Sequence, residues 1–263
     1  MFLPLSDSPN PGGRPYVTYA LIAANVLVYG LVSFPLSSQA PNPSDPALPA
    51  YVEYLRSLLP DDFSVYRALR QLSAYDLFVF AHGYKPGAPQ VGDLFASLFL
   101  HSGLMHLLGN MLFLWIYGDN VEYRLGRAAY LFWYLTTGAA ATLIFSLFAG
   151  ASMTPLVGAS GAISGVLGFY FVWFPRNRVR VFVMLFPFFM DVVSVPARIV
   201  LGVFLVLDNF LPFLLSAGEA GGGVAYGAHL GGFVVGMAVA FAITTRRTPA
   251  SRIDPPEVPA ELT

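Results

Sequence analysis

Long apolar runs separated by short polar segments dominate this sequence. Six runs could cross a bilayer as helices: residues 17–34, 94–118, 128–149, 156–174, 199–217 and 224–244. A helix rises ~1.5 Å per residue, so about 20 residues span the ~30 Å hydrocarbon core of a membrane. The pattern therefore predicts an all-α polytopic membrane protein with six transmembrane helices.

The polar segments lie around and within one membrane domain, which we place at residues 16–245. Residues 1–15 and 246–263 are polar and rich in proline, so we expect two disordered tails. Loop 35–93 contains apolar residues at helical spacing, which suggests short amphipathic helices at the membrane surface. The run 179–190 is interrupted by charges and Pro187, and we interpret it as an interfacial or re-entrant piece.

Composition agrees with a membrane protein. Hydrophobic residues make up 56% of the chain and charged residues 11%, whereas soluble domains are typically about 25% charged. No basic patch suggests a nucleic-acid partner. The chain has no cysteine, which excludes disulfides and cysteine metal sites. Ser38–Gln39–Ala40 leaves open, as an alternative, that the first run is a cleaved signal peptide.

The positive charges of the short loops predict the orientation. Arginines follow the second, fourth and sixth runs, whereas segments 150–155 and 218–223 contain neither lysine nor arginine. Positively charged loops stay on the cytoplasmic side. We therefore expect both termini in the cytoplasm and loop 35–93 outside.

The stretch Gly158–Ala159–Ser160–Gly161 opens the fourth run and is the first candidate for chemistry. Backbone N–H groups at the start of a helix have no intrahelical partner. A hydroxyl beside such donors can attack a carbonyl while the donors hold the resulting oxyanion. The structural alternative is close helix packing, because Ser160, Ser164 and Gly168 follow one another at a spacing of four residues.

Ionisable and polar groups inside other runs give this stretch possible partners. His106 and Asn110 are four residues apart on the second run, His101 precedes them, and His229 lies on the sixth. The second, fourth and sixth runs would cross the membrane in the same direction, so these groups could lie at one depth. A serine nucleophile, a histidine base and oxyanion donors must lie close together to act on one carbonyl group.

Two other kinds of site deserve comparison. Three histidines could bind zinc, but neither an HExxH pattern nor a nearby carboxylate supports a metal site. Asp208–Asn209, in the middle of the fifth run, would suit an ion path, so a transporter is an alternative function. The chain lacks the inverted halves or paired broken helices of many transporters.

Taken together, these motifs resemble those of the rhomboid intramembrane serine proteases, in particular the bacterial six-span type. The resemblance covers residues 17–244 and rests on Gly158–Ala159–Ser160–Gly161, Ala228–His229 with Gly232, His106-x-x-x-Asn110 and Glu122-x-Arg124–Leu125–Gly126. Two features of this chain differ from the pattern of that family. Ser164 stands where some members have a tyrosine, and the long loop lacks the Trp–Arg pair of many members.

The resemblance implies a six-helix bundle whose cavity opens to the outer side of a bacterial inner membrane. It implies that Ser160 is the nucleophile, His229 the base, and His106, Asn110 and the Ser160 N–H the oxyanion hole. His101, Gly158 and Gly161 would be accessory residues, and Ser164, Gly168, Gly232 and Gly236 would pack helices together. Transmembrane proteins would be the substrates, and no cofactor is implied. A catalytically inactive relative that binds or escorts membrane proteins is the alternative.

Overall fold

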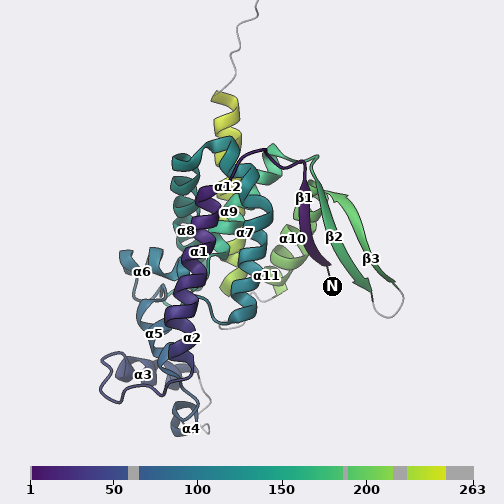
Figure 1. Ribbon diagram of the computed structural model, residues 1–263. Helices are drawn as coiled ribbons and strands as arrows, with labels where there is room; N and C mark the ends of the chain where they lie inside the picture. The colour runs from purple at the N-terminus through teal and green to yellow at the C-terminus, as the bar shows by residue number, and fades with distance from the viewer. Residues whose placement is uncertain (1, 59–64, 186–188, 216–223, 247–263) are drawn as a thin grey trace, which may run out of the picture.

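The computed structural model describes residues 2–58, 65–185, 189–215 and 224–246. Its centre is a helical bundle, with a small sheet on one side and short helices at one end (Figure 1). The bundle helices are α1 (Tyr16–Val28), α7 (Leu104–Leu125), α8 (Arg127–Ala149), α9 (Ser160–Trp173), α10 (Ala197–Leu205), α11 (Leu211–Leu215) and α12 (Val224–Arg246). The π-helical turn η1 (Tyr29–Ser33) joins α1 to α2 (Phe34–Ser37), and η3 (Val206–Phe210) joins α10 to α11.

Among the described residues, four helical stretches are long and apolar enough to cross a membrane: Tyr16–Ser37, Arg127–Ala149, Ala197–Leu215 and Tyr226–Thr245. A fifth candidate is bent by 89° between Val91–Phe99 and Leu104–Leu125. The predicted second run is therefore broken, and its helix α7 starts ten residues later than expected. The break lies at 100–103, where Leu100 is extended and Gly103 precedes the new helix.

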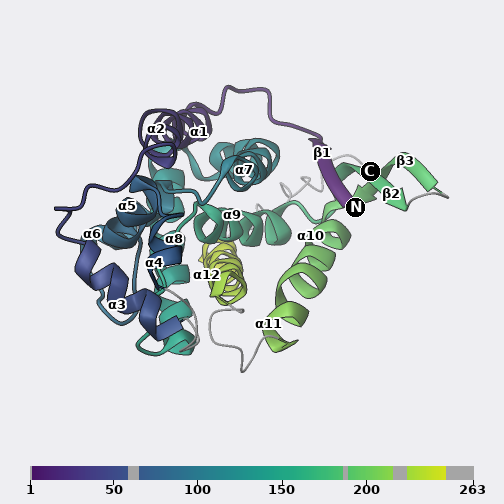
Figure 2. The same ribbon diagram turned by 90° about the horizontal axis from the view of Figure 1, so that it is seen from below.

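Helix α9 is shorter than its predicted run. It has 14 residues, or ~21 Å at the usual rise, against a ~30 Å hydrocarbon core. Viewed along the bundle, α9 lies between α7, α8 and α12 (Figure 2), and 11 of its 14 residues are buried. Backbone that is not helical can lie at membrane depth where protein surrounds it. The non-helical segment before Ser160 is thereby tolerated.

Glycines bring α9 and α12 into backbone contact. A Cβ added at Gly232 or Gly236 would overlap the carbonyl oxygens of Gly161 and Gly165, and one at Gly168 would overlap that of Phe233. The α9 positions in contact are thus Gly161, Gly165 and Gly168. The expected stripe of Ser160, Ser164 and Gly168 is wrong in two of its three positions, because the serines line a cavity.

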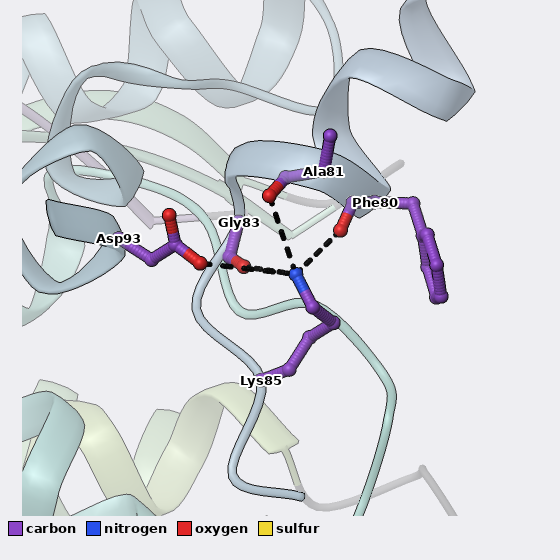
Figure 3. Close-up of polar contacts among 5 residues, drawn as sticks. All are labelled: Phe80, Ala81, Gly83, Lys85 and Asp93. Carbon is purple, nitrogen blue, oxygen red and sulfur yellow. Dashed lines mark hydrogen bonds and ion pairs between the residues drawn. The ribbon is translucent and has the colours of Figure 1, made fainter. Parts of the chain in front are cut away.

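Outside residues 59–64, the loop before α7 contains four short helices: α3 (Leu48–Leu58), α4 (Val65–Leu69), α5 (Ala74–His82) and α6 (Val91–Ala96), the last continued by the 3₁₀ turn η2 (Ser97–Phe99). Buried Lys85 anchors this loop (Figure 3). Its ammonium donates to the carbonyls of Phe80 and Gly83 at the end of α5 and lies 3.8 Å from the Asp93 carboxylate. Desolvation lowers the pKa of Lys85, and Asp93 opposes that shift.

Three strands correct the prediction of an all-α fold. Strand β1 (Phe2–Ser8) pairs antiparallel with β2 (Arg178–Leu185), which pairs antiparallel with β3 (Phe189–Pro196). The disordered tail predicted at 1–15 is wrong for β1, and the re-entrant piece predicted at 179–190 is a β-hairpin. Val179, Val181 and Val183 are buried and alternate with polar or less buried residues, which is the period of a strand. Apart from Arg246, the predicted tail 246–263 lies outside the described residues.

Two buried carboxylates join the N-terminal segment to the bundle. Glu122 of α7 accepts hydrogen bonds from the Val17 and Thr18 N–H groups at the start of α1, at 3.0 and 2.8 Å. It thereby satisfies donors that a helix start leaves without partners. Asp7 of β1 accepts hydrogen bonds from Asn120 at 2.9 Å and from the Tyr170 hydroxyl.

Burial raises the pKa of Asp7 from 3.8 to about 6, with a further rise from Asp119. Because the folded chain binds this proton more tightly, its free energy of unfolding should fall as pH rises from about 4 to about 6 and then level off. In Asp7→Asn we expect that fall to shrink. Thermal unfolding in detergent between pH 4 and 8 measures it. If the free energy of unfolding changed equally with pH in both proteins, protonation of Asp7 would not be the cause of the fall.

Glycine contacts between α9 and α12 give a second prediction. Gly232→Ala places a methyl group against a backbone carbonyl that cannot rotate away. Such overpacking costs about 1–3 kcal/mol, which corresponds to a fall of roughly 2–12 °C in the unfolding midpoint of a chain this size. Gly202→Ala on α10 is the matched control, because open space surrounds that position. Equal midpoints for the two variants would disprove the close contact.

Candidate active site

Ser160 is the first residue of α9, and the chain before it is held in a fixed path. The Gly158 N–H donates to the Ser97 carbonyl at 2.8 Å, and Tyr84 and Leu156 exchange two backbone hydrogen bonds. Gly158 has a φ of +126°, and a Cβ there would lie 2.8 Å from Cε1 of His106. Both the left-handed backbone and the close ring require glycine at this position.

His106 lies in the first turn of α7, with its ring beside Gly158. The Ser102 N–H donates to Nδ1 of His106 at 3.3 Å. Nδ1 is then an acceptor, so in the neutral ring the proton is on Nε2. Nε2 is the nitrogen that lies 3.0 Å from the position of a Cβ on Gly158. An N–H donor therefore faces the segment that leads into Ser160.

Asn110 follows His106 by one helical turn. Its side-chain Nδ2 donates one hydrogen to the His106 carbonyl at 3.1 Å. An amide nitrogen carries two hydrogens, so the second is available toward the cavity that Asn110 lines.

His229 projects from α12 into the same cavity. Its Nδ1 lies 2.7 Å from Oδ1 of Asn209. The cavity has a volume of about 260 Å³. Its lining residues are Met105, His106, Gly109, Asn110, Phe113, Ser160, Ile163, Ser164, Leu167, Phe204 and His229. Three helices thus bring together the serine, the histidines and the asparagine that the sequence singled out.

The serine and His229 share this cavity without a hydrogen bond between them in the part of the chain that the structure describes. The Ser160 hydroxyl lies 3.6 Å from the position of a Cβ on Gly158, on the side where His106 also lies. The arrangement places a nucleophile, a base and N–H donors around one space, which is the set that acyl transfer requires.

His101 does not line the cavity. It lies in the loop before α7 and not on the helix, and its side chain is fully buried. Its ring meets that of His106 edge to face, with centroids 5.1 Å apart, and neither ring nitrogen has a partner among the described residues. The Tyr75 hydroxyl donates to its backbone carbonyl at 2.8 Å. His101 therefore contacts the cavity only indirectly, through the ring of His106.

The sequence analysis misses Lys85 as an anchor and the contact of Asn209 with His229, since it considers Asn209 only beside Asp208 as part of an ion path. Nothing in the spacing of Lys85 shows that carbonyls of α5 surround its ammonium group. Spacing cannot reveal the partner of Asn209, because His229 is 20 residues away on another helix. Among the described residues, no group of three or more histidine, aspartate or glutamate side chains is placed to hold a metal ion.

Known proteins match this chain over its bundle. The family model of the rhomboid domain matches residues 88–246. RHOMBOID-like protein 1 of Arabidopsis thaliana is 28% identical over 179 residues, 68% of this chain and 40% of that protein. Rhomboid protein 1, mitochondrial, of Saccharomyces cerevisiae is 32% identical over 157 residues, 55% of this chain and 40% of that protein.

A shorter match reaches higher identity. Rhomboid protease GluP of Bacillus subtilis is 41% identical over 78 residues, which are 28% of this chain and 14% of that protein. The chain thus spans less than half the length of these relatives. These relatives come from a plant, a yeast and a bacterium. The matches therefore show the family but do not assign this chain to its bacterial type. The apolar helices and the matched domain identify the chain as a multi-pass membrane protein that belongs to the rhomboid family.

Proposed function

We propose that this chain is an intramembrane serine endopeptidase that cleaves transmembrane proteins with a Ser160–His229 dyad. The observation that carries the proposal is the single cavity lined by Ser160, His229, His106 and Asn110. Two relatives carry the activity in their names, Rhomboid protease GluP of Bacillus subtilis and Rhomboid-type serine protease 2 of Emericella nidulans. The family itself supports protease-like chemistry.

In the proposed reaction, His229 accepts the Ser160 proton while the serine oxygen attacks the scissile carbonyl carbon. Negative charge then develops on the carbonyl oxygen. The Ser160 N–H, Nε2–H of His106 and the free Nδ2 hydrogen of Asn110 would donate to that oxygen. His229 next gives its proton to the leaving amine, and the acyl group remains on Ser160. His229 then takes a proton from a water molecule whose oxygen attacks the acyl carbon. The bond between that carbon and the Ser160 oxygen breaks, His229 returns the proton to the serine, and the second product leaves.

We further propose six crossings in one membrane domain over residues 16–245, with α9 as the short central crossing. The arginine-rich segments after α7, α9 and α12 would be cytoplasmic. The cavity would then open to the outer side, near the loop that Lys85 anchors. A substrate segment would reach Ser160 from the lipid, and water would enter from the same outer side.

Ser160→Ala removes the nucleophile but little volume, so it should abolish cleavage of a transmembrane substrate and labelling by a fluorophosphonate. His229→Ala should do nearly the same, because a serine without a base is a poor nucleophile. Both are measured on purified protein in liposomes, with thermal unfolding as the check on folding. Equal cleavage by wild type and Ser160→Ala would disprove the dyad. An unlabelled, inactive wild type would favour the non-catalytic escort role.

The orientation can be tested separately, because the chain contains no cysteine. Single cysteines at Ser37 and Ala151, both exposed, should react with an impermeant maleimide added from outside. A cysteine at exposed Gly12 should react only after the membrane is permeabilised. The opposite pattern would reverse the proposed orientation.

A further inference from the structure

Asn209 is a buried polar residue in the middle of an otherwise apolar helix. Only 1% of it is exposed, and it lies in the π-helical turn η3 between α10 and α11. A polar group at membrane depth is costly unless it is hydrogen-bonded. Its neighbour Asp208 is exposed, so the two polar residues of this stretch face different surroundings.

Hydrogen bonds fix the orientation of the Asn209 amide. Its Nδ2 donates to the Phe204 carbonyl at 2.8 Å, and its Oδ1 faces Nδ1 of His229 at 2.7 Å. Exchange of the two amide atoms would set an oxygen against the Phe204 carbonyl, which has no hydrogen to give. Oδ1 is therefore the atom that meets the ring.

This orientation determines where the neutral His229 ring carries its proton. An amide oxygen only accepts hydrogen bonds, so Nδ1 must be the donor. The lone pair is then on Nε2, at the opposite side of the ring. A general base needs that lone pair directed at the proton it removes. His229 lines the cavity that also contains Ser160, so Nε2 is the nitrogen that can serve the serine.

The π turn brings Asn209 to this place. Here the Leu211 N–H bonds to the Val206 carbonyl, five residues back, so the helix is locally wider than an α-helix. Such turns are rare and often occur at functional sites. The same helix contributes Phe204 to the cavity wall, and the Asn209 amide is bonded to the Phe204 carbonyl. The wall of the cavity and the partner of His229 are thus parts of one unit.

We propose that Asn209 is a positioning residue that holds His229 with its proton on Nδ1 and its Nε2 free to act as the base for Ser160. This proposal rests on the proposed function for its catalytic consequence. The tautomer itself does not depend on catalysis. It can therefore be measured in a protein with or without activity.

The direct test is ¹⁵N NMR of protein labelled only in its histidines, at a pH where the ring of His229 is neutral. The chain has four histidines, and His229→Gln identifies the signals of interest. We expect the Nδ1–H form in the wild type and its loss in Asn209→Leu, where no acceptor remains. An Nε2–H ring in the wild type, or an unchanged spectrum in Asn209→Leu, would overturn the proposal.

Activity gives the second readout. Asn209→Leu should lower kcat by about 10–100-fold, as losses of orienting partners generally do, and leave KM within about twofold. Asn209→Asp keeps an acceptor oxygen and should recover most of the loss. Asp208→Asn, the exposed neighbour, is the matched control and should match the wild type. Wild-type kcat in a folded Asn209→Leu would refute the positioning role, whereas an inactive wild type with the Nδ1–H form would refute only the proposed function.

Discussion

The contact between α9 and α12 is the constraint on which the rest of the site depends. Lipid tails are as apolar as leucine side chains, so helices in a membrane associate mainly through close packing and hydrogen bonds. Here the carbonyls of Gly161 and Gly165 lie against Gly232 and Gly236, with no side chain between them. Ser160 and His229 lie just before these contacts on their own helices. Their distance is therefore set by backbone contact, which leaves little freedom to adjust.

A second layer of polar contacts orients the side chains that this packing brings together. His106 accepts the Ser102 N–H, His229 meets the Asn209 amide, and Gly158 is bonded to Ser97. Each contact involves the backbone or a short side chain. A preorganised site has its dipoles in place before the reaction begins, so no energy is spent on reorienting them then. Contacts of this kind hold residues from α7, α9 and α12 around the cavity.

Contacts at the two ends of the bundle hold the segments that surround the cavity helices. At one end, Lys85 binds carbonyls of α5, and the adjacent Tyr84 is paired with Leu156, four residues before Ser160. At the other end, Glu122 holds the start of α1, and Asp7 attaches β1 to α7 and α9. All three are buried ionisable groups with internal hydrogen-bond partners, and the loss of such a partner would leave a buried polar group unsatisfied.

The sequence by itself determined the membrane class, most of the helices and four polar residues of the cavity lining, His106, Asn110, Ser160 and His229. Apolar runs are local, and a serine, histidines and an asparagine inside such runs are conspicuous because they are costly there. The tertiary structure alone decided that residues 2–8 form a strand, that the second run is bent, and that α9 is short and enclosed. It also decided which glycines meet and that Asn209 faces His229. These features depend on groups far apart in the chain, and spacing along one segment carries no information about the surface that packs against it.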